Sequence, residues 1–202
     1  MGKKIGSFIL IVLLVGIVGG ATVLYNYLSK NAETDQLSVK EDTGMQDDSS
    51  AESSEDEEQY SKAPDFTVYD DEGNAYKLSE FEGKPVILNF WASWCGPCKS
   101  EMPDFEEAYN EYGEEIHFVM VNLTDGYQET VSGAKKFIED AGYTFPIYFD
   151  TKQDAARTYG VYSIPMTFFI DENGYVIAHG TGALDAKTLQ TGIDYIYDAG
   201  SQ

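Results

Sequence analysis

The sequence predicts an α/β protein whose central sheet is flanked by helices, preceded by a transmembrane helix and an acidic linker. Three observations lead to this prediction. Residues 5–28 carry no charged side chain, residues 31–60 hold eleven acidic residues against one lysine, and residues 61–202 alternate short apolar strands with helical patterns. The chain of 202 residues therefore divides into a membrane span, a tether and one domain of ordinary size.

The N-terminal apolar segment is long enough to cross a membrane. As a helix, the 24 residues 5–28 reach roughly 36 Å, against about 30 Å of hydrocarbon. Lys3 and Lys4 favour a cytoplasmic position for residues 1–4 and an extracytoplasmic position for the rest. A cleaved signal peptide is the alternative, with a weak cleavage site at residues 19–21. Because the apolar run exceeds a usual signal-peptide core, we expect a single-pass signal anchor in the cytoplasmic membrane.

The acidic segment that follows is poor in large apolar side chains. Such a composition cannot bury enough surface to offset the entropy lost on ordering. We therefore expect residues 29–60 to be a disordered tether that holds the domain away from the membrane. An acidic binding tail is the alternative interpretation.

The elements of the domain, residues 61–202, follow from local patterns. The run 85–92 is apolar almost throughout, as in a strand buried on both faces, and residues 96–112 place apolar side chains at helical spacing. Asp185 can cap a last helix that runs to about Ala199. In chain order we expect a hairpin (65–70 and 75–78), a strand (85–92), a helix (96–112), a strand (116–123), a helix (127–141), a strand (144–150), a short helix (154–160), a hairpin (166–171 and 175–180) and the last helix.

The composition excludes several functions. Thirteen Lys and Arg against 35 Asp and Glu give a net charge of −22, so we expect no nucleic acid partner. Two cysteines cannot form a four-cysteine zinc site, and His117 and His179 stand apart from them. A c-type haem would require a histidine where the chain has Lys99. We expect no metal ion and no cofactor.

The two cysteines, Cys95 and Cys98, lie where a buried strand meets a helix. Unpaired backbone N–H groups and the helix dipole lower the pKa of a thiol at such a position, which makes Cys95 a nucleophile. Cys98 lies on the same helical face and can resolve a mixed disulfide. A structural disulfide across so short a loop would constrain little of the unfolded chain. A redox-active dithiol is therefore the preferred interpretation.

Two longer motifs carry a family resemblance: NFWASWCGPCKSEMPDF at 89–105 and SIPMTFFID at 163–171. They closely resemble the thioredoxin superfamily. The apolar N-terminus and the CKSE continuation resemble its membrane-tethered TlpA/ResA branch. The resemblance covers about Pro64 to Ala199, and it implies a thioredoxin-like fold with a central mixed sheet flanked by helices.

The resemblance also implies roles for individual residues. Cys95 would be the nucleophile, Cys98 the resolving cysteine, and the two would form a redox-active disulfide. Ile164 and Pro165 correspond to a loop that lies beside the dithiol in the superfamily and carries a cis-proline. The residues expected to bind substrate are Trp94, Gly96, Pro97, Ile164 and Pro165.

One position departs from thioredoxins, which carry a buried aspartate where this chain has Asn89. An amide cannot exchange a proton near neutral pH. Glu101 is three residues after Cys98, on the same helical face, and the ResA-like branch is similar in having a glutamate there. If Glu101 is buried, its pKa rises and it can relay a proton to Cys98. The alternative is an ordinary solvated helix glutamate.

These features predict a thiol–disulfide oxidoreductase that reduces disulfides of exported proteins outside a bacterial cytoplasmic membrane. The resemblance implies a membrane electron donor of the CcdA/DsbD type, and substrates such as apocytochrome c or a methionine sulfoxide reductase. A disulfide-forming oxidase would use the same residues with the electron flow reversed. A tethered adaptor would hold partners at Trp94 and Ile164-Pro165 without exchange, and a thiol peroxidase would not need Cys98.

Overall fold

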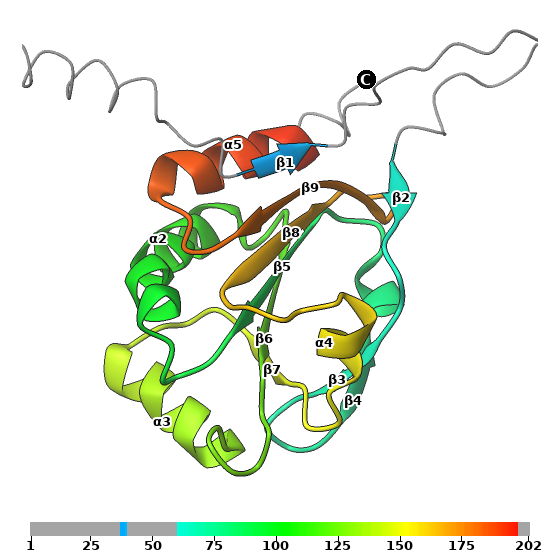
Figure 1. Ribbon diagram of the computed structural model, residues 1–202. Helices are drawn as coiled ribbons and strands as arrows, with labels where there is room; N and C mark the ends of the chain where they lie inside the picture. The colour runs from blue at the N-terminus through cyan, green and yellow to red at the C-terminus, as the bar shows by residue number, and fades with distance from the viewer. Residues whose placement is uncertain (1–36, 40–59, 198–202) are drawn as a thin grey trace, which may run out of the picture. The chain divides into compact units, whose positions relative to one another are not determined.

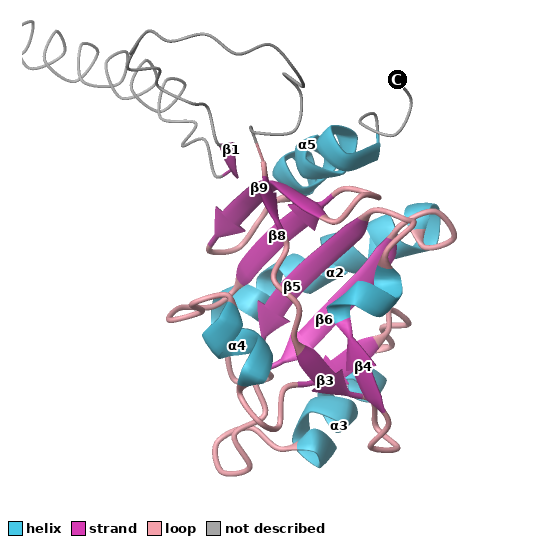
Figure 2. Ribbon diagram, turned by 90° about the vertical axis from the view of Figure 1, so that its right-hand side faces the viewer, coloured by secondary structure: helices cyan, strands magenta, loops and turns pink. Residues whose placement is uncertain are grey.

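The structure, a computed structural model, describes residues 37–39 and 60–197. The strands of these residues form one sheet in the order β1-β9-β8-β5-β6-β7-β3-β4, with β2 also paired to β9 (Figures 1 and 2). The strands are β1 (Leu37–Val39), β2 (Ser61–Lys62), β3 (Thr67–Tyr69), β4 (Ala75–Lys77), β5 (Val86–Trp91), β6 (His117–Asn122), β7 (Ile147–Phe149), β8 (Met166–Ile170) and β9 (Tyr175–Thr181). The helices are the 3-10 helix η1 (Leu78–Phe81) and the α-helices α2 (Gly96–Tyr112), α3 (Val131–Ala141), α4 (Asp154–Thr158) and α5 (Ala186–Tyr197).

The sheet is mixed, as the resemblance implied. β5 lies parallel to β6 and antiparallel to β8, and it is buried along its whole length. Its side chains alternate between two cores, as the two-residue period of a strand requires. Ile87 and Trp91 pack in the core that includes α2, α3 and α5, whereas Leu88 and Phe90 pack in the core that includes η1 and α4. In Figure 1, α2 and α3 lie on one side of the sheet and α4 on the other.

The alternation along β5 positions the functional site. Asn89 falls between Ile87 and Trp91, so its side chain points toward α2. A short loop connects β5 to α2, which has the predicted bounds, with Pro97 in its first turn and Pro103 inside it. A proline in the first turn costs no hydrogen bond, because the first N–H groups of a helix have no partner within it.

The helix predicted at 127–141 begins later, at Val131, so its predicted start is wrong. The carboxylate of Asp125 explains the difference, because its Oδ1 accepts hydrogen bonds from the backbone N–H groups of Tyr127, Gln128 and Glu129, at 2.7–2.9 Å. These bonds hold residues 125–129 as a loop. Thr130 then caps the helix by accepting from the N–H of Gly133.

The linker prediction is wrong at three residues. Leu37–Val39 form β1, an antiparallel edge strand on β9, and the Leu37 side chain is buried in the α2-side core. Burial of the Leu37 side chain and hydrogen bonding to the edge of β9 stabilise these three residues as a strand, although the surrounding segment is acidic. The remaining linker up to residue 59 and the predicted span 5–28 lie outside the described residues. Within 37–39 and 60–197, no helix has the length and apolar character that crossing a membrane requires.

The attachment of β1 leads to a prediction. Leu37→Asp places a charge in an apolar core, so we expect β1 to detach from β9 and the protein to lose about 2 kcal/mol of stability. Hydrogen exchange of the β9 amides and urea unfolding measure the two effects. Ser38→Asp is the matched control, because Ser38 is exposed in the same strand. Equal exchange in both variants would show that β1 is not held by Leu37.

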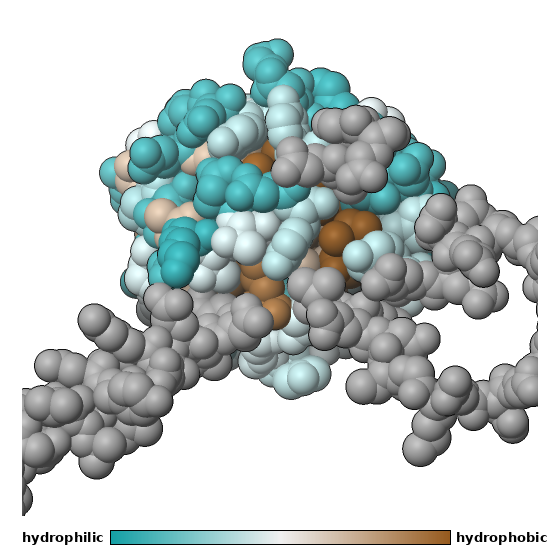
Figure 3. Space-filling model, turned by 90° about the horizontal axis from the view of Figure 1, so that it is seen from above, coloured by the Kyte–Doolittle hydropathy of each residue, from teal (hydrophilic) through white to brown (hydrophobic). Residues whose placement is uncertain are grey.

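Figure 3 shows the molecule from above, on the side of β9 and α5. Seen from above, the described residues are mostly hydrophilic, and hydrophobic side chains reach the surface only in small separate patches (Figure 3).

Candidate functional site

Cys95 and Cys98 form a disulfide bond at the first turn of α2, with their Cα atoms 5.3 Å apart. The pairing predicted from the sequence is therefore present. Cys95 is the N-cap residue of α2, and its Sγ accepts a hydrogen bond from the backbone N–H of Cys98 at 3.1 Å. This N–H and the positive end of the helix dipole stabilise a thiolate on Cys95 after reduction. Cys95 is 4% exposed and Cys98 is fully buried, so Cys95 is the sulfur that a partner can reach.

The predicted substrate-binding residues surround this disulfide. The peptide bond between Ile164 and Pro165 is cis, and the carbonyl oxygen of Ile164 lies 3.8 Å from Sγ of Cys95. Trp94 is half exposed. Gly96 and Pro97 are exposed, Ile164 is half-buried and Pro165 is buried. The structure therefore places Trp94, Gly96, Pro97 and Ile164 where a partner can touch them, whereas the Pro165 side chain is buried.

Glu101 is buried, with 2% of its surface exposed. Its Oε1 accepts a hydrogen bond from Nδ2 of Asn89, and its Oε2 accepts one from the backbone N–H of Leu184, each at 2.9 Å. Burial raises the pKa of Glu101 from 4.5 to about 7, and these two hydrogen bonds only partly oppose the rise. The alternative of a solvated helix glutamate is therefore wrong. Cys98, one helical turn before Glu101, is buried on the same helix.

Asn89 connects three elements beneath the disulfide. Its Nδ2 also donates to Oγ1 of Thr167 at 3.0 Å, so β5, α2 and β8 share one buried polar group. The Oδ1 atom of Asn89 is buried without a hydrogen-bond partner, which is a costly state for an amide. The sequence did not reveal Thr167, which sits within an apolar strand motif, or the N–H of Leu184, because backbone donors carry no sequence signal.

A second buried carboxylate near the site belongs to Glu129, which the sequence analysis did not identify. It is 1% exposed and lies before α3. Its Oε1 accepts from the backbone N–H of Ser93 at 3.1 Å and from Nδ2 of Asn122 at 2.8 Å, and its Oε2 accepts from the hydroxyl of Ser93 at 2.8 Å. Glu129 therefore fixes the loop that carries Trp94 and Cys95 to the end of β6. The one feature of the sequence that could have indicated this contact is Asn122. A polar side chain at the end of an apolar, buried strand requires a hydrogen-bond partner.

The contacts of Glu129 predict a positioning role. Glu129→Ala leaves two donor groups of Ser93 and one of Asn122 without an acceptor, so we expect a loss of about 3 kcal/mol of stability. We also expect the fluorescence of Trp94 to change and disulfide exchange to slow. Glu129→Gln keeps one acceptor oxygen and should restore part of each property, whereas Glu139→Ala, at an exposed position on α3, should match the wild type. A loss of stability without a change in exchange rate would rule out the positioning role.

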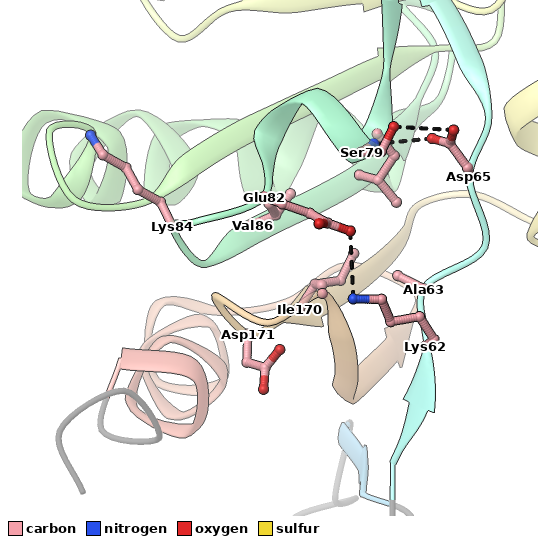
Figure 4. Close-up of a pocket in the computed structure, with 11 residues that line it drawn as sticks. Lys62, Ala63, Asp65, Ser79, Glu82, Lys84, Val86, Ile170 and Asp171 are labelled. Carbon is pink, nitrogen blue, oxygen red and sulfur yellow. Dashed lines mark hydrogen bonds and ion pairs between the residues drawn. The ribbon is translucent and has the colours of Figure 1, made fainter. Parts of the chain in front are cut away.

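Other parts of the described chain show no competing centre. No group of three or more His, Cys, Asp and Glu side chains suited to a metal ion occurs within residues 37–39 and 60–197. A cavity of about 240 Å³ lies near the start of β5, at Val86, whereas the disulfide follows the other end of that strand (Figure 4). The polar groups around it already have partners: Ser79 bonds to Asp65, and Lys62 pairs with Glu82.

Known proteins are similar to this chain in sequence and in fold. The sequence signature of the AhpC/TSA family matches residues 60–179. The thiol–disulfide oxidoreductase ResA of Geobacillus thermodenitrificans (strain NG80-2) is 38% identical over 137 residues, which are 67% of this chain and 76% of that protein. The thioredoxin-like protein YneN of Bacillus subtilis (strain 168) is 35% identical over 133 residues, covering 66% of this chain and 77% of YneN. The crystal structure of StoA from Bacillus subtilis has a TM-score of 0.56 at 30% identity, covering 64% of this chain and 96% of StoA. The chain therefore belongs to the AhpC/TSA family, as a thioredoxin-like thiol–disulfide oxidoreductase of the ResA type.

Proposed function

We propose that the protein is a membrane-anchored reductase that acts on disulfides of exported proteins outside a bacterial cytoplasmic membrane. The observation that supports it most directly is the Cys95–Cys98 disulfide itself. The more exposed sulfur accepts a hydrogen bond from the first turn of α2, and the second sulfur is buried behind it. This is the arrangement that a nucleophilic and a resolving cysteine require.

The reaction starts from the reduced dithiol. The thiolate of Cys95 attacks one sulfur of the substrate disulfide, the substrate S–S bond breaks, and the released substrate thiolate takes up a proton. Cys98 then loses its proton, and its thiolate attacks Sγ of Cys95. The mixed disulfide breaks and the second substrate sulfur leaves as a thiolate, which is protonated in turn. Two electrons have passed to the substrate, and the protein is left with the Cys95–Cys98 disulfide.

Glu101 is the group that we propose to accept the proton of Cys98. It lies one turn along α2, inside the protein, and burial holds its pKa near 7. A base whose pKa is close to the working pH can both take up and return a proton. Asn89 and the N–H of Leu184 hold the carboxylate in place.

The reducing direction rests on resemblance: Gly96-Pro97 between the cysteines and Ile164 before the cis-proline are similar to reducing thioredoxins. Each turnover consumes two electrons. A bulk thiol reductant is absent outside the cytoplasmic membrane, so the cycle needs electrons from the cytoplasm. A membrane electron carrier of the CcdA/DsbD type would supply them, and residues 5–28 would keep the protein beside it. Apocytochrome c and an extracytoplasmic methionine sulfoxide reductase are the substrate types that fit.

The equilibrium reduction potential of the full-length protein in defined thiol–disulfide buffers tests the proposal. We expect a value near that of thioredoxin, about −270 mV. A value of about −120 mV would instead indicate an oxidase and would overturn the proposed direction.

The adaptor alternative is tested in cells with a Cys95→Ser, Cys98→Ser protein. If this protein still supported function in cells, binding without disulfide exchange would be favoured.

A further inference from the structure

Exposed aromatic side chains lie in loops at the edge of the sheet where the disulfide follows β5. Five large hydrophobic side chains are exposed within the described part of the chain, and two of them, Tyr195 and Tyr197, lie on α5. The other three lie in three different loops: Trp94 is 50% exposed, Tyr127 is 95% exposed and Tyr162 is 90% exposed. Single exposed aromatics are ordinary, but three in neighbouring loops require an explanation.

The sheet topology brings these three loops to one edge. β5 and β6 are parallel, so the loop with Trp94 and the loop with Tyr127 both follow carboxyl ends, at Trp91 and Asn122, which are paired in register. β8 is antiparallel to β5, so the loop with Tyr162 precedes its first residue at the same edge, where Met166 pairs with Phe90. Adjacent strands lie about 4.8 Å apart, so the loops after β6 and before β8 flank the Cys95 loop within roughly 10 Å.

The loop that presents Tyr127 is held in place rather than loose. Asp125 accepts three backbone N–H groups across the turn, including that of Tyr127 itself. Glu129 at the end of the loop binds Ser93. The Tyr127 ring therefore projects into solvent from a loop that is bonded to the loop of Trp94. On the other side, the segment that carries Tyr162 continues to Ile164, whose carbonyl lies beside Cys95.

We propose that Tyr127 and Tyr162 extend the substrate-contact surface on both sides of Cys95, and that the substrate is a polypeptide with apolar side chains flanking its disulfide. This inference rests on the proposed function. A substrate must touch the surface around Cys95 to react, and the loops of Tyr127 and Tyr162 adjoin it through the Glu129–Ser93 hydrogen bonds and through Ile164. Tyrosine rings add contact area at little entropic cost and accept apolar neighbours.

The test uses two synthetic peptides, each closed by one intramolecular disulfide and equal in charge. One has Phe and Leu beside its cysteines, and the other has Ser and Asn. The reduced full-length protein is mixed with increasing peptide in single turnovers, and the half-saturating concentration is measured. We expect the apolar peptide to saturate at about tenfold lower concentration, since exposed aromatic anchors contribute on the order of that factor.

The variant Tyr127→Ser, Tyr162→Ser should lose most of this tenfold preference, and Tyr195→Ser, on α5, should keep it. Equal half-saturation of the two peptides by the wild type would overturn the inference. So would a preference that survives in the double variant, a shifted reduction potential in that variant, or a change only in self-association. A wild-type protein that reduces neither peptide would contradict the proposed function itself, which separates the two failures.

Discussion

Replacing Cys98 with serine will leave the protein covalently joined to its substrates. Cys95 keeps its place at the start of α2 and the stabilising N–H of residue 98, so it still attacks a substrate disulfide. Without the buried thiol of Cys98, nothing within the protein can break the mixed disulfide, because the chain has no other cysteine. Turnover should fall on the order of a thousandfold or more, since the covalent route cannot be completed.

The trapped species are measured by non-reducing electrophoresis of cells that express the variant, and mass spectrometry identifies the partners. Dithiothreitol should release them. Cys95→Ser is the matched control: it also replaces a cysteine by serine, but it removes the nucleophile and should trap little. More trapping by Cys95→Ser than by Cys98→Ser would reverse the assigned roles, and no trapping by either would remove the mixed disulfide from the mechanism.

The dithiol could be predicted from the sequence because its signals are local. A buried strand, a proline in the first helical turn and two cysteines three residues apart fix the position of Cys95 and Cys98. The period of two along β5 also explains why Asn89 meets Glu101, although the sequence alone gave no distance between them. The resemblance to the thioredoxin superfamily supplied the cis peptide bond before Pro165.

Other features depend on contacts between distant segments, and these left no readable pattern. The bond between Glu129 and Ser93 joins residues 36 positions apart, and the sequence predicts Glu129 inside a helix at 127–141. The helix begins only at Val131 because the carboxylate of Asp125 accepts hydrogen bonds from three backbone N–H groups before it, and composition does not predict these bonds. β1 was not predicted because the composition of its segment was read as an average. Its three residues lie in a segment whose average composition is that of a disordered chain, but they pair with backbone groups at the edge of β9 that would otherwise be unpaired.

Glu101→Gln will change how both stability and catalysis depend on pH. The folded protein holds a proton on Glu101 up to about pH 7, whereas an exposed glutamate releases it near pH 4.5. Between these values the folded state binds more protons than the unfolded state, so stability falls as pH rises through this window. The loss amounts to about 3 kcal/mol and is complete above the folded pKa. Glutamine carries no such proton, so the variant should lack this part of the decline.

Urea unfolding of the oxidised protein at pH 5 and pH 8 measures the effect, and Glu107→Gln is the control, because Glu107 is exposed on the same helix. The control should decline with pH as the wild type does. If Glu101 also takes the proton of Cys98, Glu101→Gln should slow disulfide exchange about a hundredfold at neutral pH and remove the inflection near pH 7 from the rate profile. A flattened stability profile with an unchanged rate would leave Glu101 as a buried structural acid, and Cys98 would then exchange its proton with water. An unchanged stability profile would contradict the raised pKa itself, because the linkage between proton binding and folding holds whatever role the residue has in catalysis.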